Sequence, residues 1–310
     1  MILTVTMNVA IDKTYVLTGE HTPGSVLRVS ACSATPGGKG LNVAKAVQAL
    51  GEPVLATGII GGHAGSWIRE NLELKGVPCD FEPAPGESRT CINIVEPSGR
   101  QTEFLEPGLV VSSEIAESFM RRFKGLVASA RAVTISGSLP QGLPEDFYAG
   151  LIGVCKKAGK PVILDTSGRL LQAGVAAKPD MIKPNLEELG QLLGRDAGQT
   201  PDAVVAAARR LHDSGIALVV VSMGSRGAVA AGREGVYHAA PPSIQAVSAT
   251  GSGDSMTAGF AVGLVRGWPL EKTLCFATAA AAANALELET GRVDMKNVHE
   301  LLQQVHVKLI

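Results

Sequence analysis

A glycine-rich turn with a carboxylate beside it is the strongest chemical signal in this sequence. Small β-prone residues lead into Thr250-Gly251-Ser252-Gly253-Asp254, and helix-forming residues continue from Ser255 to Arg266. Glycine tolerates the dihedral angles that gather several amides at a helix start, where free N–H groups and the helix dipole favour an anion. With Asp254 in the first turn, the segment suits phosphoryl transfer to an alcohol. By itself it fits equally well a strand-to-helix turn in which Asp254 only favours helix initiation.

A second glycine-rich helix start lies at residues 36–44, PGGKGLNVA. Its spacing is not that of a Walker A loop. Lys39 stands in the opening and Asn42 one turn further on. A lysine at a helix start opposes the helix dipole, so ligand binding is favoured over solvent exposure for Lys39. Asp12, just past the apolar strand Ile2–Met7, has a position at which open α/β sheets bind ligands, although an ordinary turn aspartate would look the same.

Composition excludes several classes of partner. The 310 residues are 45% hydrophobic and only 4% aromatic, and 28 basic side chains balance 29 acidic ones. We therefore expect neither nucleic acid nor a membrane surface as a partner. The N-terminus has no signal-peptide pattern, and the most apolar run, Cys275–Ala283, is too short to span a bilayer. Five scattered cysteines without metal-ligand spacing indicate free thiols, so a cytoplasmic location is expected.

Four apolar strands each end in a cluster of small polar or charged residues. They are Ala132–Ile135, Val162–Leu164, Met181–Ile182 and Ala217–Val221, and the clusters begin at Ser136, Asp165, Lys183 and Ser222. Helical segments alternate with strands, a rhythm typical of a parallel sheet. The clusters are therefore expected along one carboxyl edge of that sheet. The last third of the chain, from Ser255 to Val307, is predicted to be mostly helical.

Two β-rich insertions interrupt the alternation, at about residues 13–36 and 88–107. The first contains a strand predicted over Ser25–Ala34, which carries Arg28. The second is a hairpin that begins at Arg89, which is either a solvated edge charge or an anion clamp. Because no linker or repeat is present, residues 1–310 are expected to form one domain in which the insertions make a small β-sheet lid.

Six segments occur together in the order found in one enzyme family. PGGKGLNVA at 36–44 and ATGSGDSMTAGF at 249–260 resemble its two signatures, and GSLPQG, DTSG, KPNLEE and VSMGSRG lie between them. Over essentially the whole chain the sequence resembles the PfkB (ribokinase-like) carbohydrate kinases. It is similar to their phosphosugar branch, which includes 1-phosphofructokinase, tagatose-6-phosphate kinase and the minor 6-phosphofructokinase. The resemblance implies a three-layer αβα fold with a mostly parallel sheet and a β-sheet lid.

The resemblance also implies roles for individual residues. Asp254 would be the base, and Gly251, Ser252 and Gly253 would offer amides to the transferring phosphoryl group. Sugar-phosphate contacts would come from Asp12, Gly38, Lys39, Asn42, Arg89, Ser138 and Arg28. Nucleotide contacts would come from Lys183, Asn185, Ser222, Gly224, Gly227, Thr250 and Asn284. Asn185 and Glu188 would organise Mg²⁺ through waters. The family commonly has Asn-Pro where this chain has Asn8-Val9, which bears on how Asp12 is aimed.

The expected activity is ATP-dependent phosphorylation of a ketohexose phosphate to a bisphosphate. Fructose 1-phosphate is the first choice of substrate. Within the resemblance, Lys39 in GGKG fits 1-phosphofructokinase and tagatose-6-phosphate kinase better than the minor 6-phosphofructokinase. QTEFLEPG at 101–108 leans toward the tagatose-6-phosphate group, whereas the N-terminal pattern suits 1-phosphofructokinase equally well. Tagatose 6-phosphate and fructose 6-phosphate are alternatives. Two other possibilities are a kinase for an unphosphorylated sugar or nucleoside and a non-catalytic sugar-phosphate sensor. Apolar residues on the insertions, together with the resemblance, predict a homodimer joined through the lid.

Overall fold

Alternate residues of the central strands face two separate hydrophobic cores. In the computed structural model, which describes residues 1–194 and 200–310, Ile163 packs in one core while its neighbours Val162 and Leu164 pack in the other. Val220 likewise packs in the same core as Ile163, while its neighbours Val219 and Val221 pack in the other. A strand with apolar residues on both faces is stable only when helices cover both, as in a parallel sheet.

The large sheet is mostly parallel, with an antiparallel extension at one edge. Its strands are β1 (Ile2–Thr6), β4 (Val54–Ile60), β5 (Cys79–Pro83), β8 (Ala132–Ser136), β9 (Val162–Asp165), β10 (Met181–Ile182), β11 (Leu218–Ser222), β12 (Ala228–Gly232), β13 (Gly235–Ala240) and β14 (His306–Leu309). They follow the order β14-β13-β12-β11-β10-β9-β8-β1-β4-β5. All pairs from β11 to β5 are parallel, whereas β12, β13 and β14 pair antiparallel.

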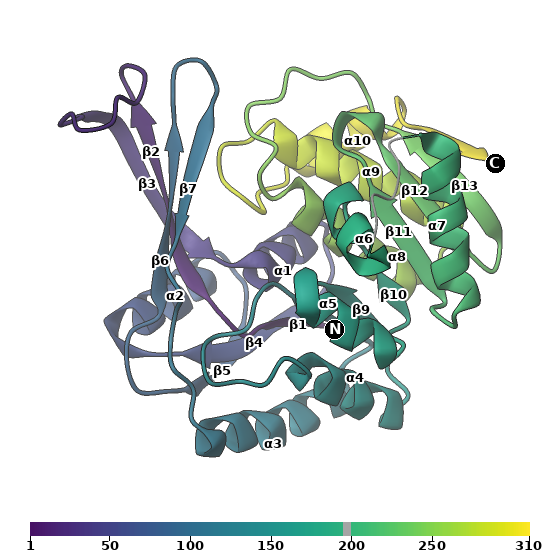
Figure 1. Ribbon diagram of the computed structural model, residues 1–310, viewed down its shortest axis with the longest axis horizontal. Helices are drawn as coiled ribbons and strands as arrows, with labels where there is room; N and C mark the ends of the chain where they lie inside the picture. The colour runs from purple at the N-terminus through teal and green to yellow at the C-terminus, as the bar shows by residue number, and fades with distance from the viewer. Residues whose placement is uncertain (195–199) are drawn as a thin grey trace.

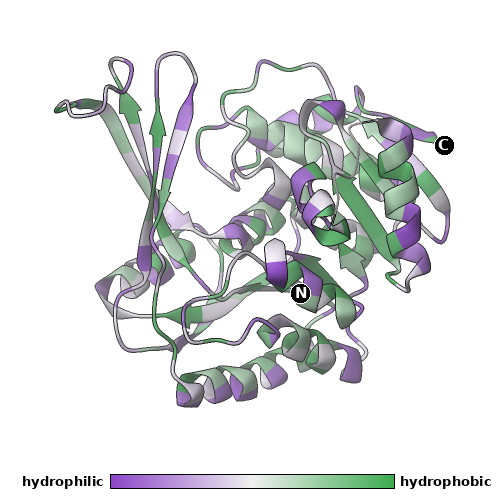
Figure 2. Cartoon of the chain, viewed as in Figure 1, coloured by the Kyte–Doolittle hydropathy of each residue, from purple (hydrophilic) through white to green (hydrophobic). Residues whose placement is uncertain are grey.

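Helices cover each face of this sheet. One layer contains α1 (Lys39–Ala49), α2 (Gly62–Leu74), α8 (Ser252–Arg266), α9 (Leu270–Ala285) and α10 (Met295–Leu302). The other contains α3 (Ser113–Ser129), α4 (Phe147–Lys157), α5 (Gly168–Ala176), α6 (Leu186–Leu193) and α7 (Pro201–Asp213). In Figure 2 the central strands are mostly hydrophobic, while α3 carries hydrophilic residues on its outer side. The layers are therefore those of an αβα sandwich.

Helix α8 is buried almost entirely and packs closely on α9. A Cβ atom at Gly259 would lie 2.5 Å from Ala277 Cα, and one at Gly263 would lie 2.4 Å from Thr273 Cγ2. Only glycine leaves room for the α9 backbone at Gly259 and for the Thr273 side chain at Gly263. The packing fixes α8 rigidly, and with it the position of the glycine-rich turn at its N-terminus.

A small four-stranded sheet stands apart from the main body as the lid (Figure 1). Its strands are β2 (Ala10–Leu17), β3 (Val29–Gly37), β6 (Arg89–Val95) and β7 (Gln101–Leu105), in the order β3-β2-β6-β7. Strands β2 and β6 run parallel, and each pairs antiparallel with its outer neighbour. We use "lid" for these four strands and the turns between them.

The fold class predicted from the sequence is confirmed, with differences in detail. The strand predicted over Ser25–Ala34 runs instead from Val29 to Gly37, and residues 241–249 form no strand before the glycine-rich turn. The antiparallel strands β12 and β13 and the C-terminal strand β14 were not predicted. Among the helices that the structure describes, none has the length and apolar character needed to cross a membrane.

Candidate active site

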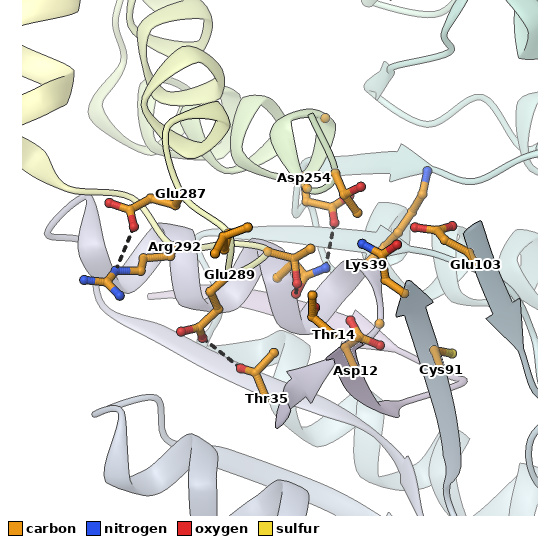
Figure 3. Close-up of a pocket in the computed structure, with 18 of the residues that line it drawn as sticks. Asp12, Thr14, Thr35, Lys39, Cys91, Glu103, Asp254, Glu287, Glu289 and Arg292 are labelled. Carbon is orange, nitrogen blue, oxygen red and sulfur yellow. Dashed lines mark hydrogen bonds and ion pairs between the residues drawn. The ribbon is translucent and has the colours of Figure 1, made fainter. Parts of the chain in front are cut away.

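A cavity of about 880 Å³ lies between the lid and the carboxyl edge of the large sheet. Most of the residues that the sequence assigned to ligands line it: Asp12, Gly38, Lys39, Asn42, Arg89, Lys183, Asn185, Glu188, Ser222, Thr250, Gly251, Gly253 and Asp254. Figure 3 shows Asp254, Lys39 and Asp12, from different elements, around the same space. The two glycine-rich helix starts therefore meet in a single cavity.

The glycine-rich turn at residues 250–254, which leads into α8, has the backbone expected of an anion-binding site. We call this turn the anion seat. Gly251 is left-handed, with φ of 85°, and a Cβ atom there would lie 3.0 Å from Gly291 N and 3.1 Å from Thr290 Cα. Both the dihedral angle and the crowding require glycine at this position. Lys183 Nζ would be 3.3 Å from a Cβ atom at Gly253. The start of α8 therefore combines the positive end of the helix dipole with an ammonium group.

Asp254 is a buried carboxylate at this seat, 6% exposed. Its Oδ2 accepts a hydrogen bond of 2.9 Å from Asn42 Nδ2. Burial, reinforced by the negative charge of Asp165, raises the pKa of Asp254 to about 6, although Lys39, Asn42 and Lys183 oppose the shift. A carboxylate with such a pKa is a stronger base than an exposed one, yet it is still largely ionised at neutral pH.

Asp165, at the end of β9, organises the cations of the cavity. Its Oδ1 lies 3.4 Å from Lys39 Nζ, and its Oδ2 lies 3.1 Å from Lys183 Nζ. Thr257 Oγ1 of α8 also donates to Oδ2, at 2.9 Å. Burial alone would raise the pKa of Asp165, but the two ammonium groups hold it below the ordinary value. The sequence predicts Asp165 at the correct sheet edge but indicates no role for it.

Asn185 and Glu188 form a capping box at the start of α6. Asn185 Oδ1 accepts from Glu188 N at 2.8 Å, and Glu188 Oε2 accepts from Asn185 N at 2.9 Å. The second oxygen of the glutamate, Oε1, lies 3.9 Å from Lys39 Nζ. Within residues 1–194 and 200–310, no group of three or more His, Cys, Asp or Glu side chains gathers to hold a metal ion.

Two lid residues bring opposite charges to the other side of the cavity. Burial raises the pKa of Asp12, while Lys45, the Gly38 amide and Arg89 lower it. Gly37 approaches the Asp12 carboxylate so closely that a Cβ atom would overlap it. Arg89 donates to Glu106 O at 3.0 Å and Asn8 O at 3.2 Å, and its buried Nε has no hydrogen-bond partner in the structure. Asp12 lines the cavity even though Val9 replaces the proline usual at that point.

The lid also contacts the anion seat directly. Gln101, the first residue of β7, accepts from Thr250 Oγ1 at 3.2 Å through its Oε1 and donates to Ser248 Oγ at 3.4 Å. Asn93 Nδ2 of the neighbouring strand donates to the same oxygen at 3.1 Å. Lid and seat therefore share a hydrogen-bond network that sequence reasoning missed, because it joins residues about 150 positions apart.

Some residues assigned to the site from the sequence do not line the cavity. Arg28 is exposed in the segment before β3. Ser138 is also exposed, and its Oγ accepts from Asn8 Nδ2 at 3.3 Å. Gly224 lies in a short 3₁₀ turn after β11. Gly227 has a φ of 86° and lies against Ala239 O, so its backbone conformation accounts for a glycine there.

Two further assigned residues also lie outside the cavity, and both make hydrogen bonds to the surrounding backbone. Ser252 donates its amide to Ala249 O at 3.2 Å, and its buried hydroxyl has no hydrogen-bond partner in the structure. Asn284 is fully buried and donates to Glu289 O at 3.3 Å and Arg292 O at 3.0 Å. Asn284 therefore holds the segment that follows α9, and Ser252 closes the turn before α8.

A family model for the pfkB family carbohydrate kinases matches residues 5–296. The chain belongs to this family. Both segments that resemble the family signatures lie within the match, and both reach the cavity.

Solved structures of similar proteins have the same architecture. Phosphofructokinase-2 from Escherichia coli, in its complex with fructose-6-phosphate, is 30% identical and superposes with a TM-score of 0.90 over 97% of this chain and 98% of that chain. A protein described as a possible 1-phosphofructokinase from Thermotoga maritima is 28% identical, with a TM-score of 0.91 over 100% of this chain and 99% of that chain. Arabidopsis thaliana ribokinase, 24% identical with a TM-score of 0.76 over 97% of this chain and 98% of that chain, shares the fold.

Membership of the pfkB family, together with the similarity to phosphofructokinase structures, makes the protein a sugar phosphotransferase of the phosphofructokinase type. The geometry of its cavity agrees with that chemistry. A buried carboxylate adjoins an anion seat and two lysines on one side, and the lid brings a second carboxylate and an arginine on the other.

Proposed function

We propose that this kinase transfers the γ-phosphoryl group of ATP to a hydroxyl of a ketohexose phosphate, giving a bisphosphate. The observation that supports this most is the place of Asp254. It is buried at the N-terminus of α8, beside Lys39 and Lys183, and it faces the cavity beneath the lid. An alcohol held in that cavity would lie between a base and the seat for the transferring group.

Each group near the seat has a defined part in the proposed reaction. Asp254 takes the proton of the sugar hydroxyl. The amides of Gly251, just before α8, and of Gly253, in its first turn, face the transferring phosphoryl group, and Lys183 beside Gly253 contributes positive charge. Lys39, between Asp165 and Glu188, adds a second cation on the side of the sugar. Because little bonding to the phosphorus develops in a loose transition state, position and charge matter more than the strength of the base.

Asn185 and Glu188 fit a magnesium ion held through water. Their mutual capping box uses one oxygen of each, which leaves Glu188 Oε1, 3.9 Å from Lys39 Nζ, as the second carboxylate oxygen of a residue that lines the cavity. Mg²⁺ commonly keeps several waters and binds through one or two carboxylates together with substrate phosphates. When bound with ATP, the ion would neutralise phosphate charge. Ser222, paired with Asn185 in an isolated bridge, would lie on the nucleotide side.

Fructose 1-phosphate is our first choice of substrate. Fructose 1-phosphate, tagatose 6-phosphate and fructose 6-phosphate each present a phosphate at one end and a primary hydroxyl at the other, as a cavity with Arg89 and Asp254 requires. Lys39 within GGKG favours the first two over the third, and a possible 1-phosphofructokinase among the similar structures supports the first. The fructose-6-phosphate complex of the E. coli relative supports the third.

A substrate panel tests the proposal. Purified protein with ATP and Mg²⁺ would be assayed against these three sugar phosphates and against unphosphorylated fructose, with the product position determined by NMR. We expect the highest kcat/KM with fructose 1-phosphate and a bisphosphate product. A higher value for either alternative would replace the substrate, whereas a preference for fructose itself would reject the proposed phosphate clamp.

Replacement of Arg89 by alanine tests that clamp. If the guanidinium binds the existing phosphate, KM for the sugar phosphate should rise about tenfold or more, because a charge-assisted hydrogen bond is lost. KM for ATP should remain nearly unchanged. The steady-state constants for both substrates give the comparison, and Arg89→Lys should retain part of the affinity. Equal effects on the two substrates would indicate a structural or nucleotide-side role.

We also propose a homodimer in which lid packs on lid. Val26, Val29 and Phe104 of the lid are 95%, 44% and 56% exposed, which is costly for an isolated small sheet. A two-fold contact would cover them and would bring Arg28 toward the partner's cavity. The E. coli relative, which has a solved tetrameric form, also supports association.

Light scattering at micromolar concentration should show a dimer, and Val29→Asp should weaken association and sugar-phosphate binding together. Val110→Asp changes a valine that is 69% exposed outside the lid and is the matched control. A fully active monomer would reject the dimer. Dissociation of the variant without loss of substrate affinity would support the lid-to-lid dimer but would contradict a contribution of Arg28 to the partner's cavity.

A further inference from the structure

The segment of residues 286–292, between α9 and α10, lies across the start of α8. Its Gly291 amide and Thr290 Cα leave no room for a side chain at Gly251, and a Cβ atom at Gly291 would be 2.7 Å from Asn42 Cα. The segment therefore touches both glycine-rich helix starts at once. No role for this segment is predicted from the sequence, because its residues match neither signature.

Side chains from several elements hold this segment in place. Glu289 accepts from Thr35 Oγ1 of the lid and from Lys75 Nζ, each at 2.8 Å. Asn284 ties down the backbone at Glu289 and Arg292. Figure 3 shows the Thr35–Glu289 contact on the lid side of the cavity. A segment restrained from both ends can present a side chain in a fixed orientation.

Thr290 presents its hydroxyl to the residue that contacts the base. Thr290 Oγ1 donates to Asn42 Oδ1 at 3.2 Å, and Asn42 Nδ2 donates to Asp254 Oδ2 at 2.9 Å. An amide can turn either its oxygen or its nitrogen toward a neighbour, and only the nitrogen suits an ionised carboxylate. A donor on the amide oxygen holds the nitrogen toward Asp254 and, by polarising the amide, strengthens that second bond.

We propose that the hydroxyl of Thr290 positions the Asn42 amide and, through it, aims the carboxylate of Asp254 at the sugar hydroxyl. Thr290 is a positioning residue: it lines the cavity but acts through Asn42. With Oδ2 of Asp254 occupied by Asn42, the other oxygen, Oδ1, is left for the substrate proton. The inference rests on the proposed role of Asp254 as the base.

The charged groups around Asp254 determine what a pH profile can report. Lys39 and Lys45 come from α1, Asp165 from the end of β9 and Lys183 from the segment after β10. Burial lowers the pKa of Lys45 to about 8, so its titration falls on the alkaline limb. The acid limb would report Asp254, whose pKa is raised to about 6, together with Asp12. No hydrogen bond joins Thr290 to Asp12 in the described structure, so a change at Thr290 should move the Asp254 contribution.

Thr290→Val removes the hydroxyl while keeping the shape of the side chain. We expect kcat to fall by several-fold to about tenfold, because the Asp254 carboxylate is oriented less well toward the sugar hydroxyl. KM for the sugar phosphate should change less than twofold. The acid limb of the pH profile of kcat should move upward by about half to one pH unit, because a weaker hydrogen bond from Asn42 raises the pKa of Asp254. Thr290→Ser, which keeps the hydroxyl, should restore both kcat and the profile.

Thr290→Ala provides a second test should the valine variant fold poorly, and circular dichroism with thermal melting checks each protein. An unchanged acid limb and a kcat within twofold of wild type in Thr290→Val or Thr290→Ala would overturn the inference. Equal losses in Thr290→Ser and Thr290→Val would do so as well, since the hydroxyl would then be irrelevant. Activity retained by Asp254→Asn would instead reject the base, and this inference with it.

Discussion

Replacement of Asp254 by asparagine is expected to abolish nearly all turnover and to make the folded protein more resistant to heat at pH 7. Asparagine can accept the hydrogen bond from Asn42 but cannot take the proton of a sugar hydroxyl. Loss of a general base typically lowers the rate about 10² to 10⁴-fold. ATP binding should persist, because the amides of α8 and Lys183 remain in place.

The expected gain in stability follows from the pKa of Asp254. Folding raises it from 3.8 to about 6, mainly through burial, so the folded state disfavours the anion. Well below pH 3.8 the carboxyl is neutral in both states, so its burial costs no electrostatic free energy. As the pH rises from 3.8 to about 6, the unfolded state ionises first, and above this range the buried anion costs about 3 kcal/mol. Asp254→Asn removes that cost, so its stabilising effect should be present at pH 7 and should fade toward pH 4.

Asp202→Asn is a matched control, because Asp202 also lies in the first turn of a helix, α7, but is exposed and far from the cavity. It should leave kcat unchanged and slightly lower the melting temperature. Calorimetry between pH 4 and 8 and steady-state kinetics provide both readings. More than about a tenth of wild-type kcat in Asp254→Asn, far above the range for a lost base, would contradict the assignment. A lower melting temperature at pH 7 would contradict the electrostatic argument.

The position of the site at one sheet edge could be predicted from the sequence because it depends on local signals. Apolar runs ending at Ser136, Asp165, Lys183 and Ser222 identify parallel strands, whose carboxyl ends meet along one edge whatever the details of packing. The glycine-rich turns at Gly38 and Gly251 likewise mark helix starts by backbone chemistry alone. These features need no knowledge of long-range contacts.

The contacts that orient the site depend on pairings between distant segments. The bond from Thr290 to Asn42 spans 248 positions, and that from Gln101 to Thr250 spans 149. No periodicity or capping pattern reports either one. Gly227 shows a different difficulty, since its sequence context suggests a ligand, while its φ of 86° and its close approach to Ala239 O require a glycine in any case. A glycine in a signature can thus serve the fold or the ligand, and only the three-dimensional contacts distinguish the two.

Replacement of Lys39 by methionine should lower kcat about 10² to 10³-fold, as expected when one group that stabilises transition-state charge is removed. Lys39 is the first residue of α1, where the helix dipole disfavours a cation. The carboxylates of Asp165, Asp254 and Glu188, with Asp165 contributing most, nevertheless raise the pKa of Lys39 and keep it charged. Its side chain is 41% exposed and lines the cavity, so the ammonium is available to a ligand.

The same substitution should move the acid limb of kcat upward, because Lys39 lowers the pKa of Asp254. The melting temperature at pH 7 should fall, since a cation whose pKa is raised by folding stabilises the folded state wherever it is protonated in both states. Lys39→Arg keeps the charge and should retain more activity than Lys39→Met, without a comparable shift of the limb. Pre-steady-state kinetics with both substrates would separate the chemical step from binding. A loss confined to KM for the sugar phosphate would show that Lys39 only binds the sugar and leaves the phosphoryl group to Lys183.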